Sequence, residues 1–126
     1  MLPLEDMEAL LEEISAEFPA QLFEGLNGGI ILLPETKLNA YSRNNDLFIL
    51  GEYHSGGNLG RYIAIYYGSF MCVYGHLGAM QLRDQLVHTL KHEFTHHLES
   101  LAGEKGLEIK DAMFLADYLK HSGRPD

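Results

Sequence analysis

The sequence predicts a single α+β domain spanning residues 1–126, with an N-terminal helix, a long helix, a short C-terminal helix and a small mixed sheet. Its 126 residues, 46% of them hydrophobic, are enough for one core and too few for two. Apolar residues recur at helical spacing in the N-terminal and C-terminal parts. Between them lie short runs of β-branched and aromatic residues, which favour about three to four strands.

The N-terminal helix is expected from Leu4 to Phe18. Its apolar residues recur every three or four positions, at Met7, Leu10, Leu11, Ile14 and Phe18. Pro3 near the start and Pro19 just after the end are typical of helix boundaries. This pattern predicts an amphipathic helix that packs on the domain.

The strands are expected at residues 29–33, 47–50 and 62–67. The first is a short apolar run that ends at Pro34, and the third alternates residues between two faces. Residues 35–46 are polar and rich in asparagine, which indicates a loop. The glycines of HSGGNLG favour a hairpin or an open loop before the third strand, and residues 68–78 favour a helical turn and a strand equally.

The long helix is expected from about Met80 to Ala102, because this stretch contains no glycine or proline. Gly103 stands where a C-cap glycine is expected. A shorter helix is predicted from about Asp111 to Lys120, followed by a tail.

Charge and cysteine content exclude several classes of protein. With 9 basic and 18 acidic residues the net charge is -9, which repels nucleic acid. Cys72 is the only cysteine, so no intramolecular disulfide forms, and a reducing cytoplasmic compartment is expected. The acidic N-terminus and the lack of an apolar run of about 18 residues predict a protein that is neither secreted nor embedded in a membrane. The oligomeric state stays open.

The long helix carries the stretch KHEFTHHLE at residues 91–99. At about 100° per residue, His92 and His96 lie on one stripe, opposite a broad apolar face. That face is formed by Leu86, Leu90, Phe94, Leu98 and Leu101. Two histidines at i and i+4 direct their imidazoles at a common point, as in helices that hold zinc by an HExxH motif. Glu93 then stands where a general base reaches a zinc-activated water.

The other histidines have different expected roles. His97 borders the apolar stripe and is expected to be a core-edge residue with a hydrogen bond to the backbone. His88 shares the stripe of His92 but lies a further turn away from His96, which argues against a ligand role. The alternative for the whole motif is a solvated helix face without metal.

Four carboxylates compete as the third metal ligand. Glu99 lies on the ligand stripe and leans back toward the helix N-terminus. Glu104 follows Gly103, where the chain can reverse and return a carboxylate to the site. Glu108 and Asp111 are later candidates near the start of the next helix.

These residues resemble the minimal zincins, small bacterial zincin-like metallopeptidases with an HExxHH motif. The likeness includes HEFTHHL, an acidic N-terminal helix like MEALLEEISAEF and a strand before a glycine like IAIYYGSF. It implies a zincin-like fold, one zinc ion per chain held by His92 and His96, and Glu93 as the general base. The chain departs from the family pattern at Glu99 and Ala102, where the family has glycine and an acidic residue.

The expected function is that of a cytoplasmic zinc metallopeptidase acting on a peptide or protein substrate. The strand at residues 62–67 is expected to align an extended peptide by strand addition at a sheet edge. The first alternative is a catalytically weak or inactive zinc-binding protein that acts through protein contacts. The second is a hydrolase of a non-peptide substrate, for which the acidic charge argues against RNA.

Overall fold

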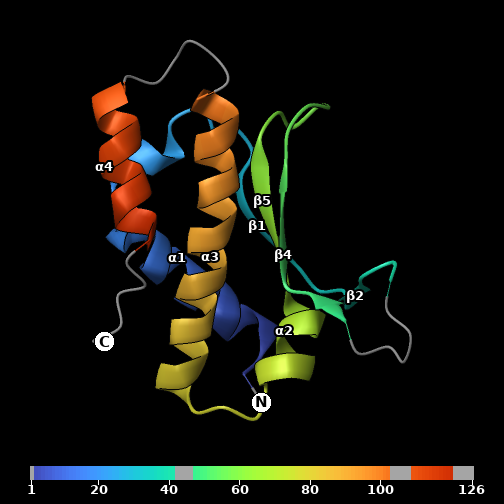
Figure 1. Cartoon of the computed structure of the whole chain (residues 1–126). Coiled ribbons are helices and arrows are strands. Elements are labelled where there is room, and N and C mark those ends of the chain that lie inside the picture. Colours follow the sequence, from blue (N-terminus) through green and yellow to red (C-terminus); the bar gives the residue numbers. More distant parts are fainter. Residues whose placement is uncertain (1, 42–46, 103–108, 121–126) are drawn as a thin grey trace.

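The computed structural model describes residues 2–41, 47–102 and 109–120, with residues 109–114 described as backbone only. Helices from the two ends of the chain pack beside a small sheet, which confirms the predicted α+β class (Figure 1). The elements in order are α1 (Leu4–Glu17), the 3₁₀ helix η1 (Ala20–Phe23), β1 (Gly29–Leu33), β2 (Lys37–Leu38), β3 (Phe48–Ile49), β4 (Gly51–His54), β5 (Tyr62–Tyr66), α2 (Tyr67–Tyr74), α3 (Ala79–Ala102) and α4 (Ile109–Lys120).

The main sheet has the strand order β1-β5-β4. The central strand β5 runs parallel to β1 and antiparallel to β4, so that Ile31, Ala64 and Glu52 lie in one row across the sheet. A separate two-stranded antiparallel sheet is formed by β2 and β3. The main sheet therefore has two edges, β1 and β4, and each can border a different surface.

Helix α3 forms the centre of the domain, between α4 and the sheet (Figure 1). Its predicted apolar stripe is buried at Leu86, Leu90, Phe94 and Leu98, and Leu101 at its end is partly buried. Helix α1 contributes Met7, Leu11 and Ile14 to the same core. The apolar periodicity of both helices thus decides which faces turn inward, and the opposite face of α3 stays free for the histidines.

Two glycines permit close approaches that place the site. A Cβ at Gly51 would lie 3.2 Å from the Thr89 side chain of α3, so glycine lets β4 run close to that helix. A Cβ at Gly68 would lie 2.2 Å from Thr36 Oγ1, so glycine is needed inside α2 although it weakens a helix. The sequence left residues 68–78 open between helix and strand. In the structure, most of α2 lies in the first part of this stretch.

Several boundaries differ from the prediction. The region expected as a loop at residues 35–46 contains the short strand β2. The strand expected at residues 47–50 is interrupted and continues as β4 to His54, at the start of the predicted glycine loop. Gly103, Glu104 and the tail lie outside the described residues. No helix in the described part of the chain is long and apolar enough to cross a membrane.

The prediction that residues 62–67 form a peptide-aligning edge strand is wrong. Strand β5 is the central strand, and both of its neighbours occupy its hydrogen-bonding edges. Ile63, Ala64 and Ile65 are all fully buried, so the alternating residues of β5 do not mark one buried and one exposed face. In the main sheet of the described chain, the strands with a free edge are β1 and β4.

Candidate metal centre

His92 and His96 lie on the exposed face of α3 and direct their imidazoles at each other. Their Nε2 atoms are 3.3 Å apart, and the ring planes are nearly perpendicular at 89°. Two imidazole nitrogens at about 2.0–2.1 Å from one tetrahedral zinc ion are separated by about 3.3–3.4 Å. The observed spacing fits this value, so the two imidazoles are placed to bind one metal ion.

Glu99 lies on the other side of the His96 ring, where its Oε1 is 3.2 Å from Nδ1. A carboxylate accepts hydrogen bonds, so Nδ1 of His96 carries the proton and Nε2 keeps its lone pair for a metal. Histidine ligands of metals usually have such a partner on the second nitrogen. The structure places Glu99 beside Nδ1 of His96, where its carboxylate can orient the ring, and its predicted role as third ligand stays a prediction.

No group of three potential ligands is found among the described residues. Glu104 and Glu108 lie outside the described residues, as does the side chain of Asp111. The prediction that one of these carboxylates completes the metal site stays open. The described part of the site consists of the histidine pair, its orienting glutamate and the glutamate that follows His92.

Glu93 is 6% exposed, although it stands next to an exposed histidine. Burial raises the pKa of this carboxyl above its ordinary value, Glu52 raises it further, and His92 and His96 act in the opposite direction. A carboxylate with a raised pKa accepts a proton more readily near neutral pH, as a general base must. Glu93 therefore has the environment expected of the catalytic base in an HExxH helix.

An open groove of about 640 Å³ contains these residues. It is lined by Gly51, Glu52, Tyr53, Ser55, His92, Glu93, His96, Glu99 and Ser100. Helix α3 supplies one wall and β4 supplies the other. Because three consecutive residues of β4 line it, from both faces of the strand, the groove follows the free edge of the sheet. We call it the α3–β4 groove.

Glu52 is a groove residue that the sequence did not identify. Its Oε1 accepts hydrogen bonds from the Lys37 ammonium at 2.6 Å and the Tyr66 hydroxyl at 2.5 Å, and lies 3.3 Å from Nε2 of His54. Burial raises the pKa of Glu52, but the bonds from Lys37 and Tyr66 outweigh it and hold the pKa below its ordinary value. Glu52 thus stays ionised beside Glu93. The only sequence signal for Glu52 is its place in the short alternating stretch GEYH, which is typical of a strand.

His97 connects three parts of the fold. It is 1% exposed, its Nε2 donates a hydrogen bond to the Glu24 carbonyl at 2.7 Å, and its Nδ1 accepts one from the Tyr53 hydroxyl at 2.8 Å. Burial lowers the pKa of His97, although the bond to Glu24 raises it, and the neutral ring fits one donor and one acceptor. The prediction of a core-edge histidine bonded to backbone is confirmed, and its bond to Tyr53 fixes β4 against α3.

The fold and the site together define a class: a small α+β domain in which an HExxH helix borders the edge of a three-stranded sheet. The chain belongs to the same family as a conserved hypothetical protein from Thermus thermophilus. The two are 35% identical over 82% of this chain and 100% of that one, with a TM-score of 0.72. No family model and no curated protein matches the chain, so the resemblance to the minimal zincins stays a prediction.

Proposed function

We propose that this protein is a cytoplasmic zinc-dependent peptidase whose metal is held by His92 and His96. The observation that supports this most directly is the 3.3 Å separation of the two Nε2 atoms, beside a buried Glu93. The spacing fits one metal ion, and the buried carboxylate fits a proton acceptor. An HExxH helix combines these two features for hydrolysis.

Each residue of the site has a distinct role in this proposal. Zinc bound there would polarise a peptide carbonyl and make water easier to deprotonate. Glu93 takes the proton of the attacking water and passes it to the departing amine, so it acts as base and then as acid. Glu99 holds the His96 ring with Nε2 directed at the metal position.

The substrate is proposed to bind along β4. This strand borders the α3–β4 groove, and among the described strands it pairs only with β5. A peptide added to its free edge would pass in front of Glu93 and the histidine pair, with main-chain hydrogen bonds holding it in register. In this proposal β4, and not the strand at residues 62–67, is the site of strand addition.

A zinc-binding protein without catalysis is the second candidate. It is favoured by the lack of a third ligand among the described residues. Two histidines alone hold zinc less firmly than the three protein ligands of catalytic sites. The two candidates share the metal site and differ only in the role of Glu93, so they require two successive measurements.

The first measurement is zinc content by elemental analysis of protein purified without chelator. We expect about one zinc per wild-type chain and almost none in His96→Ala. His88→Ala is the matched control, because it removes an exposed histidine from the same helix one turn before His92, and it should keep the metal. Wild-type protein without zinc, or equal zinc in His96→Ala, would refute the metal centre.

The second measurement separates enzyme from binding protein. Glu93→Gln keeps the shape of the side chain but cannot take a proton, so hydrolysis of a quenched-fluorescence peptide library should fall by about 10²–10⁴-fold. Zinc content should stay at the wild-type level. Zinc-loaded wild-type protein that cleaves no peptide of the library, or cleaves as fast as Glu93→Gln, would favour the non-catalytic candidate.

A further inference from the structure

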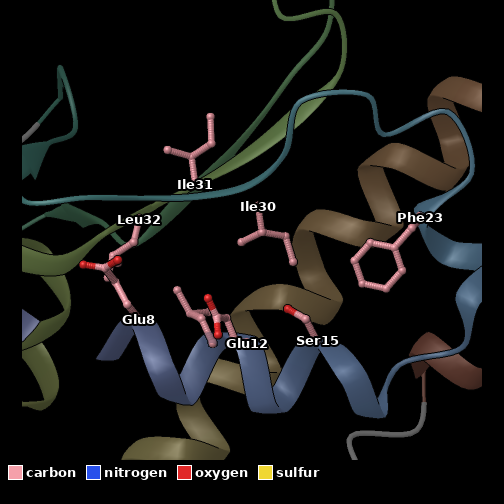
Figure 2. A pocket seen from close by; sticks show the side chains of 8 residues that line it. Glu8, Glu12, Ser15, Phe23, Ile30, Ile31 and Leu32 are labelled. Atoms are coloured by element: carbon pink, nitrogen blue, oxygen red, sulfur yellow. The ribbon is translucent and has the colours of Figure 1, made fainter. Parts of the chain in front are cut away.

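A second groove lies on the opposite edge of the sheet, between α1 and β1 (Figure 2). Its volume is about 570 Å³. It is lined by Glu8, Leu11, Glu12, Ser15, Phe23, Ile30, Ile31 and Leu32. None of these residues belongs to the α3–β4 groove, and β5 separates the two edges. We call this second cavity the α1–β1 groove.

The free edge of β1 forms one wall of the α1–β1 groove. Among the described strands β1 pairs only with β5, so alternate N–H and C=O groups point away from the sheet. Figure 2 shows Ile30 and Leu32 directed toward α1 and Ile31 directed away from it. Because side chains from both faces line the cavity, the cavity passes along the edge itself. An extended segment can therefore add to the sheet here as a fourth strand.

The wall on α1 is acidic and is not neutralised. Glu8, Glu12 and Ser15 follow one another at helical spacing and point toward β1 (Figure 2). Glu8 and Glu12 are exposed, and within the described part of the chain neither side chain makes a hydrogen bond or an ion pair. The far end is apolar, where Phe23 packs on Phe94. The groove thus offers two free carboxylates opposite an unpaired strand edge.

We propose that the α1–β1 groove binds an extended segment of a partner protein in which two basic residues flank one apolar residue. Glu8 and Glu12 are one helical turn apart on α1, which places their Cβ atoms about 5–6 Å apart. Side chains at i and i+2 of a strand are about 6.6–6.8 Å apart on one face. Since β1 runs along α1 in Figure 2, an added strand would bring two such basic side chains over the two glutamates. The intervening apolar residue would lie beside Ile31 on the other face.

Charge complementarity separates this partner from a second copy of the chain. The edge strand GIILL carries no basic residue, and the chain has a net charge of -9. Pairing two copies through β1 would bring Glu8 and Glu12 near their own equivalents, where like charges repel. A basic extended segment is attracted instead, because each of its charged side chains would lie near a free carboxylate.

The test uses fluorescent probe peptides of about eight residues in anisotropy titrations at about 0.05 M salt. The first peptide alternates lysine and valine, and the second has the same composition with all lysines together. The third is the alternating peptide with alternate amides N-methylated, so that it cannot pair with a strand edge. We expect the first peptide to bind at least about tenfold more tightly than either of the others.

Two charge-reversed proteins complete the test. Glu8→Lys with Glu12→Lys should weaken binding of the alternating peptide by at least about tenfold. Glu5→Lys with Glu13→Lys changes the net charge equally on exposed positions of α1 outside this groove, and should leave binding within about twofold. Circular dichroism establishes that both variants are folded. Equal weakening by both variants, equal binding of the clustered peptide, or no binding would overturn the proposal. So would self-association of the wild-type chain in sedimentation that Glu8→Lys with Glu12→Lys strengthens.

Discussion

The two edges of one three-stranded sheet border two grooves of different character. In the α3–β4 groove, a hydrogen bond between Tyr53 and His97 joins the strand to the helix, and the carboxylate of Glu93 is buried. In the α1–β1 groove, the walls meet through apolar packing, and the carboxylates face solvent without partners in the described chain. The same sheet thus borders one groove whose polar side chains are hydrogen-bonded and one groove whose carboxylates are free.

This difference shows that the edge strand and the neighbouring helix determine different properties of a groove. An edge strand provides the same unpaired backbone groups at β1 and β4. The neighbouring helix decides the chemistry: α3 presents histidines around a buried base, whereas α1 presents two solvated glutamates. Chemistry on a substrate requires fixed positions, while recognition of a charged segment requires only accessible charge. Four substitutions test whether the α3–β4 groove is held more firmly than the α1–β1 groove.

The largest effect is expected for His97→Ala. This change opens a cavity in the core and leaves the Glu24 carbonyl and the Tyr53 hydroxyl without their buried partner. The free energy of unfolding, measured by urea denaturation, should fall by about 2–4 kcal/mol. Ser15→Ala in the α1–β1 groove is the control and should change it by less than about 0.5 kcal/mol. Comparable losses in both variants would remove the contrast between the grooves.

An intermediate effect is expected for the pH dependence of stability through Glu52. Its pKa in the fold lies below the ordinary 4.5. The unfolded chain therefore binds the proton more readily, and the contribution of Glu52 is present above pH 4.5 and lost as pH falls through the lowered pKa. The difference in unfolding free energy between wild type and Glu52→Gln should thus shrink from about pH 6 to about pH 3 in the presence of chelator.

Lys37→Met provides a second variant for the same experiment. Without the ammonium beside Glu52, the carboxylate loses a hydrogen bond that favours its charged form. The acid-induced loss of stability should then begin at a higher pH than in the wild type. Parallel pH profiles of wild type, Glu52→Gln and Lys37→Met would show that this network does not stabilise the β4 wall.

The smallest effect is expected for Arg83→Met, which removes an ion pair between α3 and Glu17 of α1. Both side chains are partly exposed, so the unfolding free energy should change by about 0–1 kcal/mol and less in about 1 M salt. Zinc content should not change. A loss well above this range would mean that the surface pair, rather than the apolar core, joins the helices of the two grooves.

The histidine pair could be predicted from the sequence because its geometry is local. His92 and His96 are one turn apart on a helix whose apolar stripe fixes its rotation, so their direction follows from the helical repeat. The burial of His97 follows from the same repeat, since it borders that stripe. The local signal ends with α3, and the choice among the carboxylates after it depends on how the chain turns.

The opposite wall of the site could not be predicted, because it comes from another part of the chain. Glu52 and Tyr53 lie about 40 residues before the motif and meet it only when β4 docks on α3. Two glycines also made this part of the fold hard to predict, because glycine usually weakens a strand or a helix. In the structure, Gly51 and Gly68 are required by close neighbours. The central position of β5 likewise follows from strand pairing and not from its alternating residues.

The two hydrogen bonds of His97 span 44 and 73 positions of the sequence. Contacts of such separation form only after long segments of chain have closed, and they slow folding. The pair of His92 and His96, in contrast, needs only one turn of helix. During folding, the histidine pair is therefore expected to form before the wall that faces it, and the groove is completed when β4 and η1 reach His97.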